Sequence, residues 1–190
     1  MKILVLAAEA APLVKVGGLG DVVGALPVVL RALGHDVRIA LPHYGFISAM
    51  AESQSVLSVR WGRARVKTSC TLIALEDTPC LLIGGRPITP DESVYAQNGV
   101  VGTRRFVFFA LAALQHARAL GFRPDVVHVH DGHPGAALHW LQQAANAVPF
   151  WQETARVLTI HNMVYQYNEA AEALTLGGMR PTTDSRVPTW

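Results

Sequence analysis

The chain has 190 residues, of which 51% are hydrophobic and 16% are charged, and its formal net charge is +2. This composition excludes a disordered chain and fits one globular domain with a substantial core. Lysine and arginine form no block, which argues against nucleic acid or an anionic membrane surface as the main partner.

The chain opens with a predicted strand and a glycine-rich loop. Residues 3–8 form a continuous apolar run, which predicts a strand over residues 2–8 that is buried on both faces of a parallel sheet. The next loop carries Lys15, Gly17 and Gly18 just before a helical pattern. A lysine, glycines that let backbone N–H groups approach a ligand, and a helix start together favour phosphate binding. The spacing of the glycines matches neither the dinucleotide fingerprint nor the P-loop. The alternative interpretation of this segment is a tight turn with a solvated lysine.

Helices and strands alternate in both halves of the chain. The apolar spacing predicts a helix over residues 19–33, ended by Gly34 and kinked or made irregular by Pro27. Strand 37–41 completes a βαβ unit. The further predicted elements, in chain order, are strands 55–61, 64–75 and 79–83, a loop at 84–101, helix 104–120, strand 125–130, helix 134–146 and strand 155–160.

These elements predict an α/β fold, namely a Rossmann-like, doubly wound, mainly parallel sheet with a central antiparallel insert. Strands 64–75 and 79–83 form a hairpin in that insert. Residues 1–166 make up this domain. Residues 167–190 show little periodicity, and we expect an irregular tail or a truncated continuation there.

Polar residues gather after three of the predicted strands. Ligands bind beyond the carboxyl ends of the strands in such sheets, so we expect these residues to share a cleft. They are Lys15, Gly17, Gly18 and Asp21 after the first strand, His130, Asp131 and His133 after strand 125–130, and His161 and Asn162 after strand 155–160. Asp21 has a simpler interpretation, because the helix dipole favours any carboxylate in a first turn. Glu9 lies at the same edge without an assigned role.

Three segments resemble the bacterial glycogen synthases and plant starch synthases, in the order of that family. They are Lys15-Val-Gly-Gly-Leu-Gly-Asp21, which matches a Lys-x-Gly-Gly-Leu signature, Pro124-Asp-Val-Val-His-Val-His-Asp131, and Leu158-Thr-Ile-His-Asn-Met-Val-Tyr-Gln166. The Arg105-Phe106 pair that opens a helix fits as well. This resemblance, which covers the predicted first domain, implies the N-terminal half of a GT-B glycosyltransferase.

The resemblance implies a retaining glucosyltransferase that moves glucose from ADP-glucose to the non-reducing end of an α-1,4-glucan. It also implies a missing C-terminal nucleotide-binding domain, without which this chain is inactive. No cofactor is implied, and we expect no bound metal, although His128, His130 and His133 have a spacing that could bind one. His128 is expected to be a satisfied buried histidine. The sequence of this domain does not determine whether the donor nucleotide is ADP or UDP.

The same resemblance implies roles for individual residues. Lys15 stabilises the charge that develops on the distal phosphate of the leaving group, and Gly17 and Gly18 bring N–H groups to that phosphate or to the sugar. The expected catalytic residues are Lys15, Asp131 and His161. Asp131 lines the sugar side and orients hydroxyls or stabilises positive character, and His161 contacts the glucose hydroxyls or supports the ring charge through its backbone carbonyl. The expected substrate-binding residues are Lys15, Gly17, Gly18, Asp21, His161 and Asn162, and no side chain is assigned as general base.

Two departures from the family pattern keep other functions open. Gly132 replaces a tryptophan, which removes an apolar wall, and Val101-Gly-Thr103 replaces an acidic residue and an asparagine. The alternatives are a non-catalytic module that binds glucan or nucleotide, and a GT-B transferase with another sugar donor.

The remaining cysteines and histidines have structural interpretations. Cys70 and Cys80 form no Cys-x-x-Cys pair, and the N-terminal apolar run is too short for a signal peptide or a membrane span. We therefore expect reduced thiols in a cytoplasmic protein that does not bind membranes. His35, His43 and His116 belong to no motif and are expected at the surface or at edges.

Overall fold

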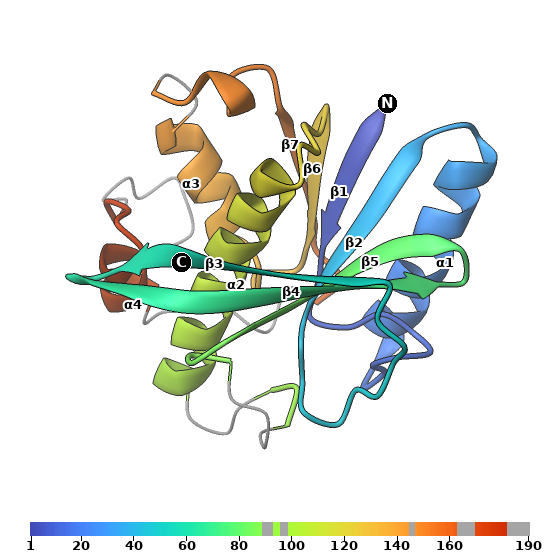
Figure 1. Cartoon of the computed structure of the whole chain (residues 1–190), viewed down its shortest axis with the longest axis horizontal. Helices are drawn as coiled ribbons and strands as arrows, with labels where there is room; N and C mark the ends of the chain where they lie inside the picture. The colour runs from blue at the N-terminus through green and yellow to red at the C-terminus, as the bar shows by residue number, and fades with distance from the viewer. Residues whose placement is uncertain (89–92, 96–98, 145–146, 163–169, 182–190) are drawn as a thin grey trace.

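A computed structural model describes residues 1–88, 93–95, 99–144, 147–162 and 170–181. Within these residues, seven strands form one sheet in the order β3-β4-β5-β2-β1-β6-β7 (Figure 1). The strands are β1 (Lys2–Leu6), β2 (Asp36–Pro42), β3 (Ser53–Trp61), β4 (Ala64–Leu75), β5 (Thr78–Gly85), β6 (Val126–His130) and β7 (Ala155–Thr159). The strands from β5 through β2, β1 and β6 to β7 pair in parallel. At the other edge, β4 pairs antiparallel with both β5 and β3.

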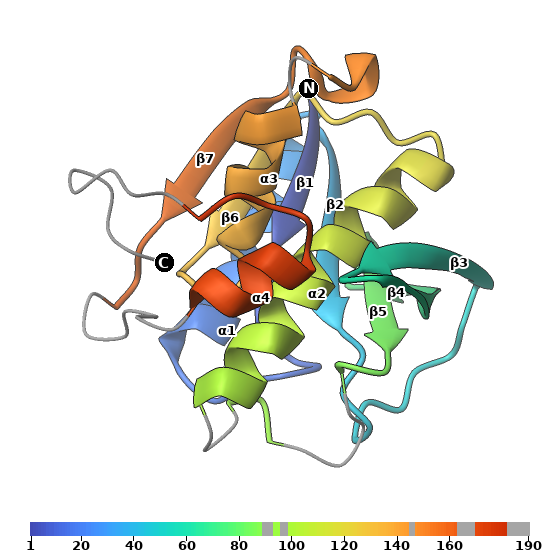
Figure 2. The ribbon, with the colours of Figure 1, turned by 90° about the vertical axis from the view of Figure 1, so that its left-hand side faces the viewer.

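Helices cover both faces of the sheet (Figures 1 and 2). They are α1 (Gly18–Ala32) on one face, and α2 (Gly99–Ala119), α3 (Ala136–Ala144) and α4 (Ala170–Leu176) on the other. Side chains alternate along β1 accordingly, because successive residues of a strand point to opposite faces. Val5 belongs to the cluster under Val23 of α1, and Leu6 belongs to the cluster under α2. Both are fully buried, as a central strand of a doubly wound sheet requires.

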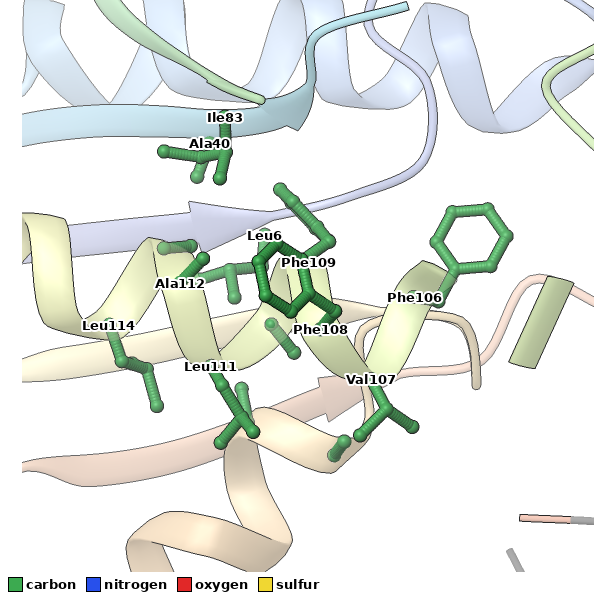
Figure 3. Close-up of a cluster of buried hydrophobic side chains, with 14 of the residues drawn as sticks. Leu6, Ala40, Ile83, Phe106, Val107, Phe108, Phe109, Leu111, Ala112 and Leu114 are labelled. Carbon is green, nitrogen blue, oxygen red and sulfur yellow. The ribbon is translucent and has the colours of Figure 1, made fainter. Parts of the chain in front are cut away.

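Helix α2 is the most deeply buried helix among the described residues. Every side chain from Phe106 to Leu114 is at most 5% exposed. Figure 3 shows Phe109 and Ala112 of this helix beside Leu6 of β1, with Ala40 and Ile83 of the neighbouring strands above them. A helix that is apolar on all sides is typical of such a position.

The predicted fold class is confirmed by this sheet and its two helical layers. The predicted hairpin joins β4 to β5 through Glu76 and Asp77, whose φ angles of 46° and 63° fit a type I′ turn. Gly34 ends α1 as predicted, with a φ of 87° and its N–H bonded to the carbonyl of Arg31. Pro27 lies buried inside α1, and the helix continues through it.

The sequence does not predict helix α4, which lies inside the segment expected to be irregular. Ala173 and Leu174 of this helix are buried in the cluster with α2. Gly178 ends the helix with a φ of 77°, and the N–H of Met179 bonds to the carbonyl of Leu174. A helix of seven residues depends on tertiary packing rather than on its own periodicity, so its sequence signal is weak. Helix α2 likewise begins at Gly99, within the predicted loop at 84–101.

Candidate functional site

The order of the strands reverses between β1 and β6, and this reversal is where a ligand is expected. Strands β2 and β5 lie on one side of β1, and β6 and β7 lie on the other. Open α/β sheets bind ligands at such a point, beyond the carboxyl ends of the strands. Leu6 pairs with Val129, and His130 pairs with Thr159. The three loops that were predicted to share a cleft therefore start side by side.

The loop after β1 is organised around the carboxyl group of Glu9, which is 2% exposed. Its Oε2 accepts hydrogen bonds from the N–H of Val16 at 2.6 Å and from the N–H of Gly17 at 2.9 Å. Its Oε1 accepts a hydrogen bond from the hydroxyl of Tyr95. The sequence left the role of Glu9 unassigned, although a carboxyl group directly after a buried strand was the available signal.

The start of α1 opens into free space. Gly17 is the N-cap of the helix, and it has no side chain that could cap the N–H groups after it. A Cβ added at Gly17 or Gly18 would meet no described atom within 4 Å. Because Glu9 already binds the N–H of Gly17, Gly18 begins the series of helix N–H groups that can face a ligand.

Lys15 and Asp21 form an ion pair at the mouth of this loop. The ammonium lies 2.7 Å from Oδ1 of Asp21, and the two side chains are 55% and 57% exposed. Exposed pairs of this kind contribute between 0 and about 1 kcal/mol, so an anionic ligand can readily displace the aspartate. The expected place of Asp21 in the first helical turn is confirmed.

Asp131 ties the end of β6 to the loop after β7. Its Oδ1 accepts hydrogen bonds from the N–H of His161 at 2.6 Å and from the N–H of Asn162 at 3.3 Å. Its own N–H donates to the carbonyl of Thr159, and its φ is 61°. The expected sugar-side carboxylate thus holds the backbone of two other predicted site residues.

Histidines of β6 lie beneath the same edge. Nδ1 of fully buried His130 is 2.9 Å from Nε2 of His161, and Nε2 of His128 is 2.7 Å from the hydroxyl of Thr159. Burial, reinforced by His128 and His161, lowers the pKa of His130 to about 3, so this imidazole is neutral. The expectation that His128 has a hydrogen-bond partner is confirmed, although the residue is half-buried rather than fully buried.

His133, in the loop after β6, packs against two aromatic side chains from other segments. Its ring centroid lies 4.8 Å from that of Tyr95 and 4.7 Å from that of Phe106. Burial lowers the pKa of His133 to about 4, and the carboxyl groups of Asp131 and Glu9 act in the opposite direction. His133 is therefore a neutral, packed side chain at this edge of the sheet.

A small apolar cavity of about 20 Å³ lies beside Gly132. Phe106 and Val107 of α2, Ala136 of α3 and Leu174 of α4 line it. This volume holds about one water molecule.

The expectation for His116 was wrong. This residue lies in α2 and is fully buried, with its ring 3.4 Å from the hydroxyls of Ser55 and Thr68. Burial lowers its pKa to about 4. Cys70 and Cys80 are buried free thiols.

The described residues include neither a cluster suited to a metal ion nor a membrane-spanning helix. Within those ranges, no group of three or more His, Cys, Asp or Glu side chains is arranged to hold a metal ion. None of the helices in the described part of the chain is long and apolar enough to cross a membrane. The end of the third motif, including Tyr165 and Gln166, lies outside the described residues.

Comparison with known proteins connects this chain to a family. Glycogen synthase 2 of Geobacter metallireducens is 37% identical over an alignment 193 residues long, and the alignment covers 96% of this chain and 39% of that protein. Glycogen synthase 1 of Synechocystis sp. is 39% identical over 168 residues, which cover 87% of this chain and 33% of that protein. This chain therefore spans less than half the length of these relatives.

A solved structure has the same fold. It is the catalytic domain of starch synthase IV from Arabidopsis thaliana bound to ADP and acarbose, with a TM-score of 0.80 and 28% identity over 94% of this chain and 37% of that one. The family described as the starch synthase catalytic domain matches residues 2–187. Because this match extends over nearly the whole sequence, the chain belongs to the family of the starch synthase catalytic domain.

Proposed function

We propose that this chain is the N-terminal domain of a retaining glucosyltransferase that moves glucose from ADP-glucose to the non-reducing end of an α-1,4-glucan. The strongest support is the meeting of three polar loops at the switch point, with Lys15 and the open start of α1 at one side. The related starch synthase IV was solved with ADP and acarbose, which suits a donor nucleotide beside an oligosaccharide-like ligand.

The donor side of the reaction needs positive charge, because the departing diphosphate gains negative charge in the transition state. Lys15 supplies a full charge, and it exchanges its contact with Asp21 for one with the distal phosphate. The N–H of Gly18 and the dipole of α1 act on the same phosphate. Asp21 thus contributes to binding through Lys15.

The sugar side of the reaction needs fixed geometry around the anomeric carbon. His161 and Asn162 bind the glucose, and Asp131 lines the sugar side while it holds their backbone N–H groups. We assign no side chain as general base. The leaving phosphate accepts the proton of the attacking glucan hydroxyl, which is consistent with retention at the anomeric carbon.

The whole reaction requires a second, nucleotide-binding domain that faces these loops. The share of the relatives that this chain covers supports that requirement. We also propose a cytoplasmic location, which the two free thiols support.

The experiment compares Lys15→Ala with Lys67→Ala in the full-length protein. Lys67 is an exposed lysine on β4, which β5 and β2 separate from β1 and the proposed site. We expect Lys15→Ala to lower the rate of glucose transfer from ADP-glucose by at least about a hundredfold, since a preorganised charge is lost. Lys67→Ala is expected to keep the wild-type rate. Equal rates in both variants would reject this function for Lys15.

A non-catalytic module that binds glucan is the second candidate, and Gly132 favours it because the family tryptophan is absent. Calorimetry of the full-length protein with maltooligosaccharide and with ADP-glucose separates the two. Heat from the glucan without heat from ADP-glucose supports the module. Heat from ADP-glucose supports the transferase.

A further inference from the structure

The carboxyl group of Glu9 lies directly beneath the loop that we propose to hold the donor phosphate. It is 2% exposed, and within the described chain it accepts three hydrogen bonds, from the N–H groups of Val16 and Gly17 and from the hydroxyl of Tyr95. A buried carboxyl group needs such partners, because an unpaired one carries a large desolvation cost. These two bonds direct the N–H groups of Val16 and Gly17 toward the buried carboxyl group, although residues 15–18 are themselves exposed.

A second set of contacts fixes Tyr95 itself. The guanidinium of Arg105 is fully buried, and its Nη1 donates to the carbonyl oxygen of Ser93 at 2.7 Å and to that of Val94 at 3.1 Å. The ring of Tyr95 packs against His133. A continuous, partly buried chain of contacts therefore runs from α2, through the segment 93–95, to Glu9 and the loop at 15–17.

We propose that Glu9 is a positioning residue for phosphate binding, and that Tyr95 holds its carboxyl group in the required orientation. The proposal rests on the proposed function, because it assumes that a diphosphate binds at this loop. Glu9 withdraws the N–H groups of Val16 and Gly17 from the ligand. The first turn of α1 and the ammonium of Lys15 are then the groups that face the phosphate.

The negative charge of Glu9 opposes the binding of an anion. Glu9 therefore cannot favour a phosphate ligand by direct electrostatic attraction, only by positioning the loop. A carboxylate near a diphosphate repels it, so Glu9 can favour the ligand only through the shape that it gives the loop. Gly20 is consistent with close packing of this unit, because a Cβ there would lie 3.2 Å from Oε2 of Glu9 and 3.1 Å from the carbonyl oxygen of Val14.

The test compares Glu9→Gln, Glu9→Ala and Tyr95→Phe in the full-length protein, with ADP and inorganic pyrophosphate as ligands. A glutamine keeps one oxygen that can accept both N–H groups and an amide that can donate to the oxygen of Tyr95. An alanine removes every acceptor. The measurements are ligand affinity by calorimetry, hydrogen exchange at residues 15–18, and KM and kcat for glucose transfer.

We expect Glu9→Gln to bind both ligands at least as tightly as the wild type, with wild-type exchange. Glu9→Ala should exchange faster at residues 15–18, bind both ligands about tenfold or more weakly, and raise KM more than it lowers kcat. Tyr95→Phe should have an exchange rate at residues 15–18 and a ligand affinity between those of the two Glu9 variants. It remains informative if Glu9→Ala does not fold. Thermal unfolding of each variant identifies those that fold.

Three results would overturn the proposal. They are wild-type exchange and affinity in Glu9→Ala, wild-type values in Tyr95→Phe where Glu9→Ala does not fold, and loss of affinity in Glu9→Gln while its exchange stays at the wild-type level. Failure of the proposed function is distinguishable, because the wild-type protein would then bind neither ADP nor pyrophosphate. The exchange comparison would still report whether Glu9 orders the loop.

Discussion

Nδ1 of His130 lies 2.9 Å from Nε2 of His161, and this contact joins the end of β6 to the loop after β7. His130 is fully buried, and its Nε2 has no partner among the described residues. Its single ring hydrogen bond therefore goes to a residue that is exposed in the proposed cleft. The buried histidine thus holds the ring of the exposed one.

Replacing His130 by phenylalanine tests this arrangement, because it keeps a buried ring and removes both ring nitrogens. One hydrogen bond is lost and one unpaired nitrogen is removed, so we expect stability to change by no more than about 1.5 kcal/mol. We expect kcat for glucose transfer by the full-length protein to fall about tenfold, because the ring of His161 loses its support. Steady-state kinetics and thermal unfolding measure the two effects.

His128→Phe is the control for His130→Phe. His128 lies on the same face of β6, but its Nε2 bonds to Thr159 rather than to His161. We expect the kcat of the His128→Phe variant to fall less than the kcat of the His130→Phe variant. Equal values of kcat for His130→Phe and the wild type would contradict the supporting role.

Buried histidines also make the stability of the chain depend on pH. Burial lowers the pKa of His116 and of His133 to about 4, and burial with its histidine neighbours lowers that of His130 to about 3. An unfolded histidine titrates near pH 6.5, as model peptides do, so below about that pH the unfolded chain binds more protons. We expect the free energy of unfolding to decrease from pH 7 to pH 5, by up to about 1.4 kcal/mol per pH unit for each histidine. Urea unfolding at pH 7, 6 and 5 measures this decrease.

His116→Gln provides a control away from the proposed site. A glutamine can replace the hydrogen bonds to Ser55 and Thr68, and it does not titrate. We expect a smaller decrease in stability between pH 7 and pH 5 for this variant. An unchanged decrease would show that His116 is not neutral in the folded protein.

The sheet could be predicted because each strand carries its own local signal. The strand predicted over residues 64–75 coincides with β4, and the strand predicted over residues 2–8 contains β1. The hairpin was visible from the polar residues between two apolar segments, but the two-residue turn at Glu76 and Asp77 was not. Its type depends on the pairing of Leu75 with Thr78, which the register sets.

The sequence could predict which loops form the candidate site, but it could not predict the side-chain contacts within the site. The rule for ligands in open sheets located the three loops, since it requires the strand order alone. The hydrogen bond between Tyr95 and Glu9 joins residues 86 positions apart, and no local pattern indicates it. The burial of His116 was missed because Gln115 and Arg118 make the last turns of α2 polar, and the apolar stretch before them does not mark a solvent face.

The turn between β4 and β5 offers a test of the fold that is independent of the site. Asp77 has a φ of 63°, a conformation that costs an L-residue with a Cβ about 1–2 kcal/mol and costs glycine little. We expect Asp77→Gly to stabilise the chain by about 0.5–1 kcal/mol, since type I′ turns favour glycine. Chemical unfolding measures the gain. A loss of stability would contradict the two-residue turn.

Gly18→Ala and Gly24→Ala form a matched pair in α1 that separates ligand binding from packing. A Cβ at Gly18 would meet no described atom within 4 Å, whereas one at Gly24 would lie 2.6 Å from the carbonyl oxygen of Ala11. We expect Gly24→Ala to cost about 1–3 kcal/mol, because backbone must move. Gly18→Ala should keep or raise stability, because alanine favours helix, yet weaken ADP binding by the full-length protein, because its methyl group occupies the proposed phosphate space. Calorimetry and urea unfolding measure both variants, and wild-type ADP affinity in Gly18→Ala would exclude phosphate from the start of α1.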